Sequence, residues 1–196
     1  MIRRTDHHRK SVRLPEYDYS QAGAYFVTIV TNQRACLFGQ IIEHQMCLSE
    51  AGHIAEACWL VIPAHFSHAE LGAFVVMPNH IHGILILHDR AAANLPENRA
   101  AMKSPPVGAT HWVAPTPDAE RRQPKGPKRG SIGAIVGAYK MAVTRQIVQT
   151  LGGAPNILQR NYHEHIIRNE RDHRNVHDYI VVNPLNWQTD DENQGW

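Results

Sequence analysis

The sequence has few cysteines, no long apolar run and little net charge. Its three cysteines, Cys36, Cys47 and Cys58, are odd in number and form no C-x-x-C pair, so neither a disulfide framework nor a structural zinc knuckle is expected. No apolar stretch approaches the ~20 residues of a membrane-spanning helix, and the first residues lack an apolar signal core, so we expect a cytoplasmic protein. A net charge of +2 does not by itself indicate a nucleic-acid-binding protein.

The chain is long and apolar enough for one buried core. With 196 residues, 43% of them hydrophobic, a single domain over 1–196 is expected. Its charge is unevenly distributed, with a basic arm at 1–13 and a second basic cluster at 121–129. Such clusters can follow a phosphate backbone in a chain that is nearly neutral overall, although a solvated arm is the alternative. The basic residues of the arm that we consider as DNA contacts are Arg3, Arg4, Arg9 and Lys10.

Hydrophobic periodicity predicts alternating strands and helices. Strands are expected over 25–31, 40–48, 70–77, 80–87 and 162–167, and helices over 49–62, 131–152 and 169–183. Ser49 and Ser131 are the expected N-caps of the first two helices, and Pro63 and Pro184 are expected to end the first and the last. This order favours an α+β fold, an antiparallel sheet with helices against one face.

The segment 89–130 interrupts this pattern. It contains seven prolines and scattered charge, a composition that does not support a packed element. We therefore expect a long loop or a flexible insert within the single domain.

The most specific local pattern is His80-Ile81-His82. Side chains on a strand alternate, so the two imidazoles point to one face and Ile81 to the other. Two imidazoles on one strand face are suitable metal ligands. The alternative is a pair of ordinary strand histidines in a chain that holds fourteen.

A second pattern lies near the end of the last predicted helix. Tyr179 and Asn183 are four residues apart and therefore share a helical face. An amide oxygen beside a phenol would suit a catalytic site in which the amide binds a metal and the phenol attacks a phosphate next to that metal. A core tyrosine and a helix-terminal asparagine before Pro184 are the alternative.

These residue types suit phosphoryl transfer. A tyrosine hydroxyl has a free pKa of ~10 and needs a nearby cation to favour the phenolate. Attack on a DNA phosphodiester forms a phosphotyrosine link and releases a deoxyribose hydroxyl, so the bond energy is kept for a later joining step. Neutral ligands, two His and one Asn, leave the cation charge free to attract the phosphate, which favours one Mg²⁺ or Mn²⁺, although imidazoles would suit zinc as well.

The chain resembles the single-tyrosine HUH transposases, and most of all the REP-associated tyrosine transposases of bacteria. The resemblance extends over nearly the whole sequence. The motifs that carry it are YDY with GAYFVT at 17–28, FVVMPNHIHG at 74–83, GAYK with AVT at 137–144, QRNY with EHIIR at 159–168, and DYI with NP at 178–184.

This resemblance implies a ferredoxin-like α+β fold, the HUH endonuclease fold. It implies His80, His82 and Asn183 as ligands of one Mg²⁺ or Mn²⁺ and Tyr179 as the nucleophile. The implied partner is single-stranded or hairpin DNA, of the repetitive extragenic palindrome type, bound by a monomer or a homodimer. The implied activity is metal-dependent DNA cleavage and strand transfer.

The sequence also offers a second candidate nucleophile, two candidate phosphate contacts and two alternative functions. Tyr139 is a rival nucleophile, but its i+4 residue is Val143 and its face is apolar, so we interpret it as a core residue. Arg160 and Arg168 flank the strand at 162–167 and could reach phosphate, or be exposed structural arginines. The alternative functions are a catalytically silent DNA-binding protein on the same fold and a metal-dependent phosphodiesterase that uses water.

Overall fold

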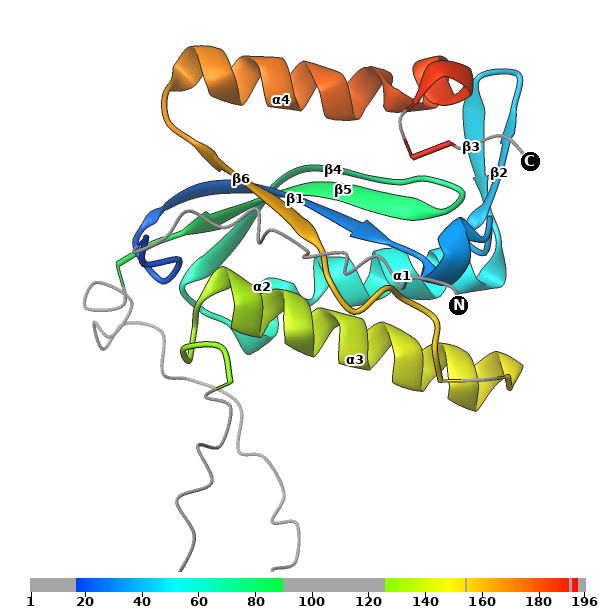
Figure 1. Ribbon diagram of the computed structural model, residues 1–196, viewed down its shortest axis with the longest axis horizontal. Helices are drawn as coiled ribbons and strands as arrows, with labels where there is room; N and C mark the ends of the chain where they lie inside the picture. The colour runs from blue at the N-terminus through cyan, green and yellow to red at the C-terminus, as the bar shows by residue number, and fades with distance from the viewer. Residues whose placement is uncertain (1–16, 90–125, 154, 191, 194–196) are drawn as a thin grey trace, which may run out of the picture.

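The computed structural model describes residues 17–89, 126–153, 155–190 and 192–193 (Figure 1). The four basic residues of the predicted N-terminal arm, and most of the predicted insert at 89–130, lie outside the described residues. Among those described, no helix combines the length and the apolar character needed to cross a bilayer.

A four-stranded antiparallel sheet forms the centre of the molecule. Its strands are β1 (Gly23–Val30), β4 (Ala69–Val76), β5 (His80–Leu87) and β6 (His163–Ile167), in the order β4-β5-β1-β6. One helical crossover separates β1 from β4 and another separates β5 from β6, which gives the split βαββαβ arrangement of ferredoxin-like folds. The predicted fold class is confirmed.

Two of the helices pack on one face of this sheet. They are α1 (Glu50–Leu60) and α3 (Ile132–Leu151), which lie below the sheet in Figure 1. Both predicted N-caps are confirmed, because the hydroxyl of Ser49 accepts from Gly52 N and that of Ser131 from Ala134 N.

The last helix, α4 (Glu170–Val182), covers the opposite face of the sheet (Figure 1). The prediction that all helices lie against one face is therefore wrong. Central strands β1 and β5 are buried on both sides, and Phe26 and Ile84 pack against Ile180 of α4. A sheet with two apolar faces needs a cover on each of them.

Three boundaries also differ from the predictions. The single strand expected at 40–48 is a hairpin of β2 (Gly39–Ile42) and β3 (Gln45–Leu48), because Glu43 and His44 adopt the positive φ values of a tight turn. The helices α1 and α4 end shortly before the two prolines, at Leu60 and Val182, but the chain continues in a short helical segment after each. Pro63 lies in the first turn of the short α2 (Ile62–His65), and Pro184 in that of the 3-10 helix η4 (Asn183–Thr189), where a missing N–H costs nothing.

Gly83, directly after the H-x-H motif, has a packing role. The ring of Trp59 in α1 lies so close that a Cβ on Gly83 would come within 2.2 Å of Trp59 Cζ2. Trp59 is fully buried, and its ring packs edge-to-face on Tyr139 at a centroid distance of 5.3 Å. The glycine therefore lets α1 approach β5, which holds the histidine strand against the core.

Candidate active site

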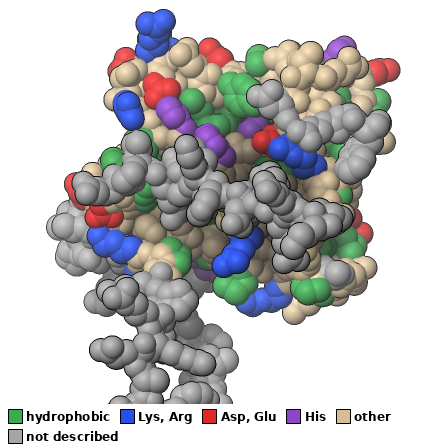
Figure 2. All heavy atoms as spheres, viewed as in Figure 1, with side chains coloured by type: hydrophobic (Ala, Val, Ile, Leu, Met, Phe, Trp, Pro, Cys, Tyr) green, Lys and Arg blue, Asp and Glu red, His purple; other side chains and the backbone are tan. Residues whose placement is uncertain are grey.

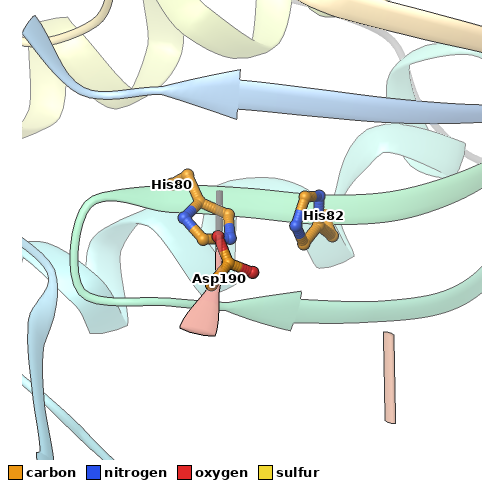
Figure 3. Close-up of side chains that lie close together, drawn as sticks. All are labelled: His80, His82 and Asp190. Atoms are coloured by element: carbon orange, nitrogen blue, oxygen red, sulfur yellow. The ribbon is translucent and has the colours of Figure 1, made fainter. Parts of the chain in front are cut away.

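The two histidines of β5 lie on the face covered by α4. His80 and His82 are 0% and 2% exposed, and their ring centroids are 4.3 Å apart. Ile81 between them points into the opposite core, as the alternation of a strand requires. Figure 3 shows the two imidazoles side by side on β5, with Asp190 approaching from the C-terminal segment.

Neighbouring side chains orient both imidazoles. The Asn79 amide nitrogen donates to the carbonyls of Arg34 and Glu192, so its Oδ1, 2.8 Å from His80 Nδ1, must accept a hydrogen from that ring. His80 Nε2 then carries a lone pair, and it is buried with no hydrogen-bond partner among the described residues. His82 Nδ1 lies 2.9 Å from Thr28 Oγ1. In a metal-binding histidine, a hydrogen bond usually holds one ring nitrogen in this way and leaves the other available for the metal.

Burial keeps the imidazoles uncharged at neutral pH. It lowers the pKa of His80 to about 4, although the nearby Asp190 carboxylate acts in the opposite direction. Burial also lowers the pKa of His82 well below its ordinary value, helped by the charges of His80 and His163. Neutral imidazoles are the form that binds a cation.

Tyr179 and Asn183 of the last helical segment reach this histidine pair. The Tyr179 hydroxyl lies 3.2 Å from His82 Nε2, and its side chain is 42% exposed, so one side of the phenol faces solvent. Asn183 is 1% exposed, and its Oδ1 is buried without a hydrogen-bond partner among the described residues. The structure thus brings together the four residues that the two sequence patterns identified.

Asp190 is the site residue that the sequence did not reveal. Its Oδ2 accepts from Asn183 Nδ2 at 2.8 Å and lies 3.4 Å from the Tyr179 hydroxyl, while its Oδ1 accepts from Glu192 N at 2.7 Å. One ligand atom each of His80, His82 and Asp190 lies within 4.8 Å of the others, so the three could hold a metal ion. The sequence suggested neutral donors alone, whereas in the structure a carboxylate also lies among them.

The C-terminal segment is positioned by long-range contacts. Arg34, after β1, forms an ion pair with Glu192, and Asn79 donates to the Glu192 carbonyl at 2.9 Å. These contacts hold the chain just after Asp190 beside the start of β5. The only sequence signal was the acidic run at 190–192, and nothing in its spacing linked it to the histidines.

The remaining candidates lie elsewhere. Tyr139 is 3% exposed and its hydroxyl donates to the Ala55 carbonyl at 3.1 Å, on the far side of the sheet, which confirms its interpretation as a core residue. Arg160 and Arg168 are exposed on either side of β6. On the face drawn in Figure 2, histidine side chains gather where β6 passes below α4.

Comparison with known proteins identifies a relative of this chain. No family model matches the chain. An uncharacterized protein of Haemophilus influenzae is 36% identical over 186 residues, which are 94% of this chain and 92% of that protein. The chain belongs to the same protein family as this Haemophilus influenzae protein.

Two solved structures are also similar. One is a REP-associated tyrosine transposase bound to a REP hairpin, with 21% identity, a TM-score of 0.48, and coverage of 89% of this chain and 74% of that one. The other is a candidate transposase from Deinococcus radiodurans, with 16% identity, a TM-score of 0.42, and coverage of 86% and 95%. At these identities and TM-scores, neither structure supports an activity or a residue role for this chain.

Proposed function

We propose that this protein is a metal-dependent single-stranded DNA endonuclease and strand transferase that acts through a covalent phosphotyrosine intermediate. One observation carries the proposal: the hydroxyl of Tyr179, a residue that is 42% exposed, lies 3.2 Å from Nε2 of the buried His82, within a cluster of oriented potential metal ligands. A solvent-facing nucleophile next to a cation site is the arrangement that phosphoryl transfer requires.

The residues present fit a divalent cation. His80 Nε2 and Asn183 Oδ1 are buried and have no hydrogen-bond partner among the described residues, a costly situation that a bound cation would relieve. We propose His80 and His82 as ligands with Asp190, and Asn183 as a further oxygen donor. A mixed nitrogen and oxygen set suits Mn²⁺ well and also accepts Mg²⁺. When bound, the cation supplies positive charge that polarises the scissile phosphate.

Tyr179 would attack the phosphorus in line with the leaving oxygen. The phenol proton passes to the Asp190 carboxylate, which lies 3.4 Å from the hydroxyl. A bond forms between the tyrosine oxygen and phosphorus, and the bond from phosphorus to one deoxyribose oxygen breaks. That oxygen takes up a proton from solvent and leaves as a hydroxyl. A strand end can later reverse the step and restore a phosphodiester, so no water is consumed.

The proposed substrate is a single-stranded or hairpin DNA segment, of the repetitive extragenic palindrome type that the sequence motifs suggest. Arg160 and Arg168, exposed beside β6, are proposed to contact its phosphates. Phosphate contacts of this kind would position the strand without reading its sequence.

Covalent capture of DNA tests the proposal. The full chain is incubated with labelled single-stranded hairpin DNA in Mn²⁺ or Mg²⁺ and separated on a denaturing gel. We expect a protein-linked strand with the native chain and none with Tyr179→Phe, which removes only the hydroxyl. Tyr139→Phe is the matched control, because it removes a tyrosine hydroxyl from the opposite face of the sheet, and it should retain the adduct.

Each other outcome identifies a different function. Cleaved DNA without a linked strand would indicate hydrolysis by water. Binding that is insensitive to EDTA, with no cleavage in either metal, would indicate a catalytically silent DNA-binding protein. An adduct that survives Tyr179→Phe and disappears in Tyr139→Phe would show that the site assignment is wrong.

A further inference from the structure

A cavity lies beyond the end of β1, between the residues that follow β1 and those that precede β6. Its volume is about 640 Å³, within the range of small-ligand pockets. Five of its six lining side chains are carboxamides and the sixth is an arginine. No hydrogen bond joins any of the six side chains to another described residue. They are Asn32, Gln33, Asn156, Gln159, Arg160 and Asn161.

The backbone that carries these side chains is held rigidly. Asn32 N donates to the Ile157 carbonyl at 2.8 Å, and Gln159 N donates to the Val30 carbonyl at 2.9 Å. From α3, Lys140 Nζ donates to the carbonyls of Gln159 and Arg160. These hydrogen bonds join the two walls of the cavity to the end of β1 and to α3, so the backbone that carries the carboxamides is held in place.

The chain on each side of the cavity continues into a strand, β1 or β6, that reaches the histidine site. Asn32 follows Thr28, the partner of His82, by four residues, or roughly 13 Å of extended chain at about 3.3 Å per residue. Asn161 precedes His163 by two residues, and His163 pairs with Thr28 in the sheet. A strand of DNA with a phosphate beside Tyr179 therefore needs to extend only a few nucleotides to reach the cavity.

The chemistry of the lining favours a nucleobase over a phosphate. A carboxamide presents a donor and an acceptor in one plane, which matches the edges of the bases. A phosphate offers only acceptors and attracts cations, and this cavity holds a single one, Arg160. We propose that the cavity binds an unpaired nucleobase of the DNA strand whose phosphate lies at Tyr179, and so determines where the strand is cut. This inference rests on the proposed strand-transfer function.

Binding of defined single strands tests the cavity. The full chain in EDTA is titrated into labelled dA, dC and dT homopolymers of equal length and into an abasic strand with the same phosphates, and anisotropy is recorded. We expect the native chain to bind one homopolymer about tenfold more tightly than the abasic strand. In the double variant Gln159→Ala and Asn161→Ala, that preference should fall to about twofold while abasic binding is unchanged.

Two further variants keep the result interpretable. Gln149→Ala removes a carboxamide that lines a different cavity, between α2 and α3, and should keep the native preference. If the alanine variant does not fold, the double variant Gln159→Glu and Asn161→Asp takes its place. It conserves the shape of the side chains, replaces amide donors with carboxylate oxygens, and should also abolish the preference.

The remaining outcomes separate this inference from the proposed function. A native chain that does not distinguish bases from abasic sites, or a double variant that weakens all strands equally, would overturn the nucleobase cavity. A covalent adduct on the denaturing gel without any base preference would overturn the cavity alone. A base preference that disappears in the double variant, with no adduct in either metal, would overturn strand transfer and leave the cavity standing.

Discussion

The two faces of the central sheet are built from the same strands but hold very different residues. Toward α1 and α3, β1 contributes Tyr25, Val27 and Ile29, all fully buried in the main apolar core. Toward α4, the apolar cluster is small, and His80 and His82 are buried beside it. Burying polar groups costs free energy unless they are paired. The first face therefore provides stability, and the second holds the proposed active site.

The largest expected effect comes from breaking the polar face. His82→Ala removes a proposed ligand and should lower the rate of covalent DNA capture by at least about 10³-fold, because losing a catalytic cation costs several kcal/mol of transition-state stabilisation. The measurement is the initial rate of adduct formation on a denaturing gel. His88→Ala is the control, since His88 is an exposed histidine just after β5 that pairs with Glu70. Native rates in His82→Ala would exclude the histidine pair from the reaction.

Breaking the apolar face should act on stability instead. Ile135 of α3 is fully buried, so Ile135→Ala should lower the free energy of unfolding by about 2–5 kcal/mol through lost burial and a residual cavity. Urea unfolding followed by circular dichroism measures this loss. Val181→Ala, at an exposed position of α4, should change it by less than about 0.5 kcal/mol. If both variants lost the same stability, the contrast between the faces would be wrong.

A finer test removes the orientation of a ligand but keeps the ligand itself. Thr28→Val deletes the hydroxyl 2.9 Å from His82 Nδ1 and should weaken Mn²⁺ binding by about 10–100-fold, the usual effect of losing a hydrogen bond that orients a metal-binding histidine. Isothermal titration calorimetry measures the affinity. Thr144→Val, on α3 beneath the other face, should bind Mn²⁺ with native affinity. Equal affinities in the two variants would show that Thr28 does not orient His82.

The smallest expected effect distinguishes the two tyrosines. Tyr139→Phe removes the hydrogen bond to the Ala55 carbonyl and should cost about 1 kcal/mol of stability. Thermal unfolding measures this shift. Adduct formation should be native in the same sample, provided that it is assayed well below the unfolding transition. A loss of adduct without a loss of stability would contradict the division between the faces.

Much of the fold could be predicted because its signals are local. The strand and helix periodicities and the caps Ser49 and Ser131 depend on residues a few positions apart. The predictions that were wrong concern features that depend on more than a few neighbouring residues. Glu43 and His44 adopt the positive φ of a hairpin turn that no Gly or Asn marks, and α4 covers the second face because β1 and β5 are apolar on both sides.

The candidate site divides in the same way. The alternation of a strand puts His80 and His82 on one face, and helical spacing puts Tyr179 near Asn183, so the sequence by itself determined these two pairs. Only the tertiary structure decided that the pairs meet, and that Asp190, Thr28 and Asn79 join them. Periodicity specifies which side chains share a face of one element, whereas contacts between distant elements depend on how the whole chain packs around its core.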